Sequence, residues 1–313
     1  MIFLIYAIIA AGVTFLSVKA ADYVDLIDKK TSLSGAFIGG IMLSAVTSLP
    51  ELFTSLSSTL LLDEPGLCIG NILGSNIFNL SARAMLIVVF NRTFADAHIA
   101  RSHRSVLRLL LVAYAALALN MFGLLSFELF TVSITSVILL ACYISSVKHL
   151  SGEESDESEE DTNPLTLKQV LIRFFFVAVG IVVLSILISQ VTDMLAEELN
   201  LGKSLAGALF MGVATSLPEL SSTITLFRKK SFDIAVGNIV GSNIFNLIIL
   251  SVADLCYTGT GLYDFSDPKT VALLGFGFLA HPLALGVLKL RYRWLQVILS
   301  LGIVGCYIGF LSI

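Results

Sequence analysis

Apolar residues fall into ten blocks along this chain, and each block is long enough to cross a lipid bilayer. The blocks cover roughly residues 2–20, 33–60, 70–91, 105–123, 127–147, 169–191, 203–227, 236–257, 270–288 and 293–312. A membrane-spanning helix needs about 17–25 predominantly apolar residues. The pattern therefore predicts an all-α integral membrane protein with ten transmembrane helices.

Composition and charge support this class and set an orientation. The 313-residue chain is 56% hydrophobic and 13% charged, whereas a soluble domain carries about 25% charged residues. All but Lys203, Lys269 and Arg83 of the 19 Lys and Arg residues lie near one set of alternating loops. By the positive-inside rule these loops are cytoplasmic. Both termini are then expected to be extracytoplasmic.

Two motifs occur twice. The segment Ala45–Leu52 recurs as Val213–Leu220, and Gly70–Leu80 recurs as Gly237–Leu247. The chain thus divides into a first half, residues 1–147, and a second half, residues 169–313, with five spans each. An odd number of spans places the halves in opposite orientations, the inverted repeat typical of secondary transporters.

The segment 148–168 joins the halves and contains the strongly acidic run Ser151–Asp161. Like charges at this density repel one another and stay solvated, so we expect a disordered cytoplasmic linker. The alternative is a weak Ca²⁺ or polyamine sensor, although the run lacks the ligand spacing of an EF-hand.

Glu51 and Glu219 are the candidate centre of function. Each lies within a long apolar span, where a charged side chain is costly and usually functional. The repeat relates their positions, so both are expected to approach the bilayer midplane from opposite sides. Their charges would repel, and a divalent cation such as Ca²⁺, which accepts six to eight oxygen ligands, would neutralise both. The alternative is a pair of carboxylic acids hydrogen-bonded within the bundle.

Neighbouring residues can supply further oxygen atoms. Pro50 and Pro218 each remove a backbone donor and kink their helices. The kinks allow carbonyl groups to turn inward, on Ser44, Thr47, Gly212 and Thr215. Hydroxyl and amide oxygens come from residues four apart on shared helix faces, Ser75 with Asn79 and Ser242 with Asn246, and from Ser48 and Ser216. Gly70, Gly74, Gly237 and Gly241 are expected to allow close helix packing.

The paired motifs T-S-L-P-E and G-N-x-x-G-S-N-I-F-N resemble the two alpha-repeats of the cation/calcium exchanger superfamily, particularly its prokaryotic sodium/calcium exchangers. The motifs cover residues 44–80 and 212–247. The resemblance implies the sodium/calcium exchanger fold, with eight core helices and two long helices, the first and sixth, that slide across them.

The resemblance also implies a ligand set. Ca²⁺ would bind Glu51 and Glu219 together with the carbonyls of Thr47 and Thr215. Na⁺ would share the glutamates and add oxygens from Ser44, Ser48, Ser75, Gly212, Ser216 and Ser242. Asn79 and Asn246 would complete the central position. Because both ions need the same carboxylates, they should compete, and competition is the basis of exchange.

The sequence departs from the family pattern in three respects. Val46 and Ala214 replace the glycine that usually precedes the motif threonine, which would stiffen the kink. Asn246 stands where potassium-dependent exchangers carry Asp, so we predict no K⁺ co-transport.

The third departure is Arg83, whose repeat partner is Leu250. One interpretation is that it snorkels to the surface or pairs with a carboxylate such as Asp25. The other is that it lines the inner vestibule, repels entering cations and lowers the number of Na⁺ ions bound.

The sequence therefore predicts a secondary-active antiporter that exchanges Na⁺ for Ca²⁺ by alternating access. We expect a prokaryotic plasma (inner) membrane protein, monomeric, with the lipid bilayer and the two ions as partners and with neither cofactor nor nucleic acid. At three Na⁺ per Ca²⁺, as in relatives, transport would respond to voltage. The alternatives are an antiporter that exchanges H⁺ for Ca²⁺ or another divalent cation, and a non-transporting receptor. No nucleophile–base pair, phosphate loop or cofactor motif indicates an enzyme.

Overall fold

The computed structural model describes residues 2–129, 132–152, 163–198, 213–257, 261–290 and 292–313, and most of them are helical. Its helices are α1 (Ile2–Lys30), α2 (Gly35–Phe37), the π-helix η1 (Ile38–Leu43), α3 (Ser44–Thr47), α4 (Leu49–Leu60), α5 (Pro65–Val89), α6 (Asn91–Phe94), α7 (Ser102–Met121), α8 (Ile134–Ser151), α9 (Leu167–Glu198), α11 (Leu217–Lys229), α12 (Phe232–Cys256), α13 (Pro268–Lys289) and α14 (Arg293–Leu311). Strands β1 (Glu128–Leu129) and β2 (Val132–Ser133) pair antiparallel ahead of α8. Most of the acidic run and the predicted ligand Gly212 lie outside the described residues.

The described helices match the predicted spans closely. Eight of them are long and apolar enough to cross a membrane, and a bent pair, Gly35–Thr47 with Leu49–Leu60, makes a ninth. The predicted span 203–227 begins outside the described residues, and its described remainder is helical from Val213 to Thr215 and through α11. Both α1 and α9 extend beyond the predicted ends at 20 and 191. The span predicted from 127 begins as a helix only at Ile134, because β1 and β2 come first.

The duplicated T-S-L-P-E motif breaks its helix in both halves. In the first half, Ser48 has φ −94° and ψ 4°, and α4 begins at Leu49 with Pro50 in its first turn. The chain bends by 43° at this break. In the second half, Ser216 has φ −87° and ψ 8°, and α11 begins at Leu217 with Pro218 in the same position. Proline is tolerated in a first turn because those amides have no helical partner. The predicted kinks are therefore confirmed.

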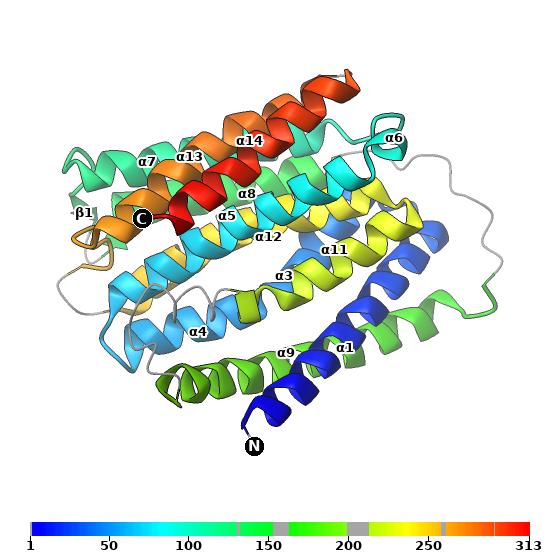
Figure 1. Ribbon diagram of the computed structural model, residues 1–313, viewed down its shortest axis with the longest axis horizontal. Coiled ribbons are helices and arrows are strands. Elements are labelled where there is room, and N and C mark those ends of the chain that lie inside the picture. Colours follow the sequence, from blue (N-terminus) through cyan, green and yellow to red (C-terminus); the bar gives the residue numbers. More distant parts are fainter. Residues whose placement is uncertain (1, 130–131, 153–162, 199–212, 258–260, 291) are drawn as a thin grey trace.

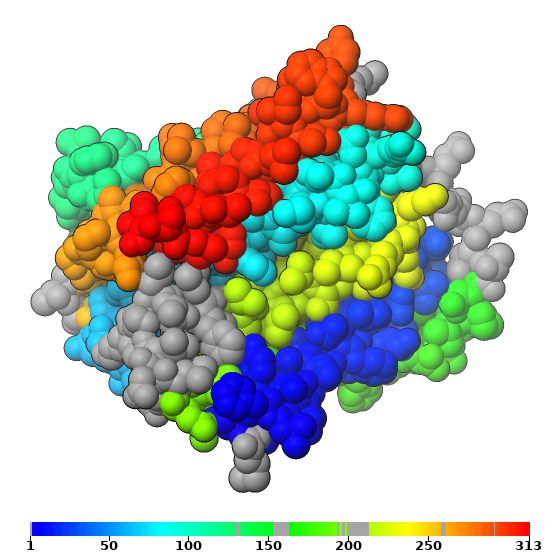
Figure 2. Space-filling model, viewed as in Figure 1, coloured from blue at the N-terminus to red at the C-terminus, as the bar shows by residue number. Residues whose placement is uncertain are grey.

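Two helices of the repeated G-N-x-x-G-S-N motif form the centre of the molecule. Helix α12 packs against η1, α3, α4, α5, α7, α8 and α11, while α5 also packs against α13 and α14. The long helices α1 and α9 lie side by side on one flank, opposite α13 and α14 (Figure 1). In the face shown in Figure 2, α1, α11, α5 and α14 form successive ridges.

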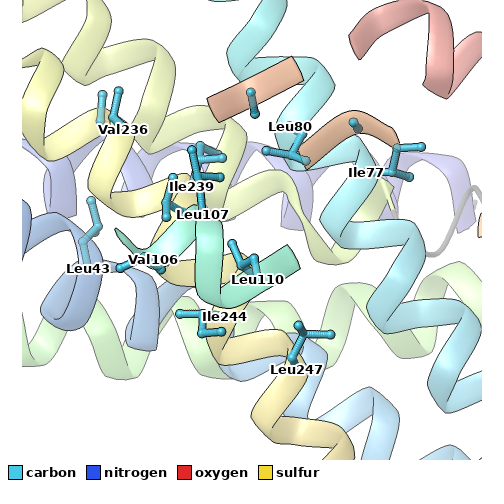
Figure 3. Packing of buried hydrophobic residues seen from close by; sticks show 14 of the residues in the cluster. Leu43, Ile77, Leu80, Val106, Leu107, Leu110, Val236, Ile239, Ile244 and Leu247 are labelled. Atoms are coloured by element: carbon cyan, nitrogen blue, oxygen red, sulfur yellow. The ribbon is translucent and has the colours of Figure 1, made fainter. Parts of the chain in front are cut away.

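Apolar side chains fill the centre and also cover the outside. Ile77 and Leu80 of α5, Val106, Leu107 and Leu110 of α7, and Val236, Ile239, Ile244 and Leu247 of α12 point into one buried cluster with Leu43 (Figure 3). Large apolar residues are also exposed on the outer faces, among them Leu4 and Ile8 of α1 and Phe175 and Phe176 of α9. A bilayer solvates such faces as well as a protein interior does.

Two of the four motif glycines bring backbones together. A Cβ on Gly237 would lie 2.9 Å from the nitrogen of Gly40, and a Cβ on Gly241 would lie 2.2 Å from the oxygen of the same residue. Close packing was predicted for these glycines and is confirmed for this pair. For Gly70 and Gly74, no described residue lies within 4 Å of such a Cβ.

Candidate functional site

The two central glutamates are held by a reciprocal pair of hydrogen bonds. Ser48 Oγ donates to Glu219 Oε1 at 3.0 Å, and Ser216 Oγ donates to Glu51 Oε1 at 3.2 Å. Each serine precedes the glutamate of its own half by three residues but binds the glutamate of the other half. All four side chains are fully buried, and the carboxylates lie close enough for Glu51 to repel Glu219. The glutamates therefore meet, as predicted.

The breaks in the motif helices explain this crossing. Because the helix stops at Ser48 and restarts at Leu49, the serine takes a non-helical conformation at the start of a new helix. Its side chain can then leave its own helix and reach the opposite half. Ser216 does the same ahead of α11.

Several buried side-chain oxygen atoms lack a hydrogen-bond partner within the described residues. They belong to side chains predicted as ligands, and they are Glu51 Oε2, Glu219 Oε2, Ser75 Oγ, Asn79 Oδ1 and Asn246 Oδ1. An unpaired buried acceptor costs about 1–3 kcal/mol, so five in one region require compensation. A cation satisfies several oxygen acceptors at once.

The amide groups of four asparagines interlock across α5 and α12. Asn76 Nδ2 donates to the carbonyl of Asn243 at 3.2 Å, and Asn243 Nδ2 donates to the carbonyl of Asn76 at 3.0 Å. Asn79 Nδ2 then donates to Asn243 Oδ1 at 3.3 Å, and Asn246 Nδ2 donates to Asn76 Oδ1 at 3.1 Å. The amide nitrogens of Asn79 and Asn246 are thereby engaged, which leaves their oxygens as acceptors.

The interlocking Asn76 and Asn243 were not predicted as functional residues. Each is the second of the three asparagines in G-N-x-x-G-S-N-I-F-N, so their duplication was visible in the sequence. They act on the site by fixing Asn79 and Asn246. The first asparagines of the same motif, Asn71 and Asn238, hold α4 and α11 by donating to Ser55 Oγ and Ser222 Oγ at 3.0 and 3.1 Å.

The remaining predicted ligands differ in how they are engaged. Thr47 Oγ1 lies 3.4 Å from Ser242 Oγ and donates to the Ser44 carbonyl at 3.3 Å. That carbonyl also accepts from Ser48 N at 3.0 Å, so it is already hydrogen-bonded within its own span. Thr215 is buried and close to the Glu51 carboxylate.

Arg83 lies deeper in the protein than the sequence suggested, and it is not paired with Asp25. Its side chain is fully buried, so it neither snorkels to the surface nor lines an open vestibule in this conformation. Its predicted partner Asp25 instead binds Lys229 Nζ at 3.2 Å, accepts a hydrogen bond from Ser231, and lies 3.6 Å from Lys29 Nζ. None of the three guanidinium nitrogens has a hydrogen-bond partner in the described residues.

Within the described part of the chain, no third acidic, histidine or cysteine side chain joins the two glutamates to form a metal cluster. The site is therefore built from two carboxylates and neutral oxygens. Hard oxygen ligands of this kind suit Na⁺ and Ca²⁺ rather than the transition metals, which favour nitrogen and sulfur.

Comparisons with known proteins agree with this architecture. The chain resembles the sodium-calcium exchanger NCX_Mj in a structure soaked with 10 mM Na⁺, with a TM-score of 0.73 and 20% identity over 100% of this chain and 99% of that one. It is 28% identical to the sodium/calcium exchanger MaX1 of Methanosarcina acetivorans over 295 residues, covering 80% of this chain and 83% of MaX1.

It is also 28% identical to the inner membrane protein YrbG of Escherichia coli over 225 residues, which cover 68% of this chain and 66% of YrbG. The family model for the sodium/calcium exchanger protein matches residues 1–150 and 169–313, which is nearly the whole chain. The chain therefore belongs to the sodium/calcium exchanger protein family, and it is a multi-span membrane antiporter of cations rather than an enzyme.

Proposed function

We propose that this protein exchanges Na⁺ for Ca²⁺ across a prokaryotic plasma membrane by alternating access at the site between Glu51 and Glu219. The observation that carries the proposal is the set of unpaired, buried oxygen atoms on these glutamates and on Ser75, Asn79 and Asn246. Ca²⁺ takes six to eight oxygens at about 2.3–2.6 Å in flexible geometry. Two carboxylates also balance its charge. The protein itself supplies the oxygens, and no cofactor is required.

In this proposal the ligands are those expected from the sequence. Ca²⁺ binds both glutamates and the carbonyls of Thr47 and Thr215. Na⁺ uses the same glutamates and takes further oxygens from Ser44, Ser48, Ser75, Gly212, Ser216 and Ser242. Asn79 and Asn246 complete the centre through their amide oxygens. Because one set of carboxylates serves both ions, each ion displaces the other.

The neutral oxygens favour Na⁺ over H⁺ as the coupling ion. A proton needs only a carboxylate oxygen, whereas Na⁺ needs several ligands. The oxygens of Ser75, Asn79 and Asn246 are buried and unpaired within the described residues, and a proton bound to a glutamate would leave most of them unpaired. With two carboxylates in the site, we also expect no K⁺ co-transport.

Flux measurements in proteoliposomes test the proposal. An outward Na⁺ gradient should drive uptake of radioactive Ca²⁺, and a pH gradient of equal size should not. Glu51→Gln should abolish uptake, while Glu198→Gln, which changes an exposed carboxylate at the end of α9, should leave it unchanged. Uptake driven by the pH gradient alone would replace Na⁺ with H⁺ as the coupling ion. Full uptake by Glu51→Gln would refute the site.

A further inference from the structure

Arg83 is a charged group buried in the core, and no acidic side chain in the described part of the chain forms an ion pair with it. It lies on α5, the helix that carries the proposed ligands Ser75 and Asn79, and its side chain is 0% exposed. An Arg side chain stays protonated in proteins. A buried charge is normally paired, because removing it from water without compensation is very costly. The balancing charge must therefore be sought nearby.

The histidine that interacts with Arg83 does not supply that charge. His281 of α13 lies within electrostatic range of Arg83, and its Nδ1 lies 2.7 Å from the Gly277 carbonyl. Because a carbonyl only accepts, Nδ1 carries the proton. In the neutral ring Nε2 is then a lone-pair acceptor. The ring of Tyr114 lies 4.5 Å from the His281 ring. Both groups are polar, and neither is an anion.

Of the buried carboxylates in the described residues, all but two already bind other groups of the protein. Asp25 binds Lys229 and Ser231. Asp254 of α12 accepts from Ser133 N at 2.8 Å and Ser136 Oγ at 2.6 Å, at the opposite end of the bundle. This leaves Glu51 and Glu219 as the carboxylates that can balance Arg83.

The separation is short enough for the charges to interact. Ser75, which lies close to the Glu51 carboxylate, precedes Arg83 by eight residues, or about 12 Å of helix rise. Helical side chains tilt toward the N-terminus, so Arg83 leans toward Ser75 and Asn79. At this distance, with an effective dielectric constant of about 20, repulsion by Arg83 lowers the binding affinity of a cation about tenfold for each unit of the cation's positive charge.

The charge balance then distinguishes the two ion loads. Two glutamates and Arg83 give the buried core a net charge of −1. Bound Ca²⁺ changes it to +1, and two bound Na⁺ ions also give +1. A third Na⁺ would give +2 in a fully buried region, which is far less favourable. One Ca²⁺ and two monovalent ions therefore leave the occupied site with the same net charge.

We propose that Arg83 takes the place of one transported cation, so that each Ca²⁺ exchanges for two monovalent ions with no net movement of charge. The inference rests on the proposed function, because it concerns the same two glutamates. It differs from the three-for-one ratio implied by the resemblance. It applies equally whether the monovalent ion is Na⁺ or H⁺.

The test measures Ca²⁺ gradients in proteoliposomes with the membrane potential clamped by K⁺ and valinomycin. For wild-type protein, a tenfold Na⁺ gradient should hold about a 100-fold Ca²⁺ gradient rather than about 1,000-fold, because each tenfold step corresponds to about 1.4 kcal/mol. Applying about 100 mV should leave this gradient unchanged. If one net charge moved per cycle, the same voltage would shift it about 50-fold, and that result would overturn the inference.

Two substitutions assign the effect to Arg83. Arg83→Leu, which installs the residue found at the repeat-related position Leu250, should admit a third Na⁺ and make exchange voltage-dependent. Arg83→Lys keeps the charge and should remain insensitive to voltage. An Arg83→Leu protein that transports without voltage dependence would refute the role of this residue. If Arg83→Leu does not fold, the wild-type measurement and Arg83→Lys still decide.

The two proposals fail in different ways. Absence of Ca²⁺ flux under both Na⁺ and pH gradients would overturn the proposed exchange, and this inference with it. Voltage-dependent exchange by wild-type protein would overturn the inference and leave the proposed exchange intact.

Discussion

A methyl group added at Gly241 is a direct test of how helix packing positions the ion site. The new Cβ would lie 2.2 Å from the oxygen, 2.6 Å from the Cα and 2.7 Å from the carbonyl carbon of Gly40. Ordinary contact begins at 3.4 Å, so the oxygen must move from 2.2 to 3.4 Å, a retreat of about 1.2 Å. Backbone atoms cannot rotate away as a side-chain end can. Helix η1 therefore has to move relative to α12.

The expected cost has a stability part and a functional part. Overpacking costs about 1–3 kcal/mol, and replacing a helical Gly by Ala returns up to about 1 kcal/mol, so we expect a net loss of about 1–2 kcal/mol. Gly40 also accepts a hydrogen bond from Ser44 Oγ at 2.8 Å, and Thr47 follows in the next helix. A shift of about 1 Å exceeds the tolerance of direct Ca²⁺ ligation, so apparent Ca²⁺ affinity should fall at least about tenfold.

Thermal unfolding in detergent and Ca²⁺ uptake in proteoliposomes measure both parts. Gly241→Ala should lower the Tm by several degrees and weaken Ca²⁺ uptake. Gly275→Ala is the matched control, because Gly275 lies within α13, is exposed, and has no described residue within 4 Å of its added Cβ. Its Tm should stay the same or rise slightly. The reasoning would be refuted if Gly241→Ala had the same Tm and Ca²⁺ affinity as the wild type, or if Gly275→Ala lost as much of both.

Three further predictions concern charge and hydrogen bonding. Ser48→Ala removes the donor to Glu219 and should weaken apparent Na⁺ affinity by about tenfold or more, since a hydrogen bond to a charged group contributes about 1.5–3 kcal/mol. Titrating Ca²⁺ uptake with Na⁺ measures this affinity, and an unchanged value would argue against Ser48 as a ligand. Lys229→Met breaks half-exposed ion pairs to α1 and should cost less than about 1 kcal/mol, so a Tm loss above a few degrees would show a larger role. Asn246→Asp adds a negative charge beside Asn76 Oδ1 and should raise the number of coupled cations, which the clamped-voltage assay would reveal as voltage-dependent exchange.

Duplication made the centre of the site predictable from sequence. Glu51 and Glu219 follow identical S-L-P segments in two spans, and an inverted repeat brings equivalent positions toward one point. The break before each glutamate was predictable for a local reason, because proline lacks a backbone N–H and its ring clashes with the preceding turn, so it kinks or breaks a helix beyond the first turn. Both features depend on residues close in sequence and on symmetry.

Contacts between distant residues were less predictable. The assignment of Asp25 to Arg83 failed because Lys229, more than two hundred positions away, folds back against α1 and competes for the carboxylate. Hydropathy also underestimated the lengths of α1 and α9. Hydropathy detects the apolar part of a helix that crosses the bilayer and misses polar turns beyond it, such as the turn with Lys29 and Lys30 at the end of α1.

The site combines symmetric ligands, which the asparagine interlock holds in place, with an asymmetric charge. The bonds between Asn76 and Asn243 are reciprocal, as contacts across a twofold axis must be, and they fix Asn79 and Asn246 equivalently. Ligand geometry is thus nearly the same from either half. Charge is different, because Arg83 has Leu250 as its repeat partner. In the proposed mechanism, this asymmetric charge biases ion binding without disturbing the ligands. The charge carried per cycle can therefore change through one residue outside the ligand set.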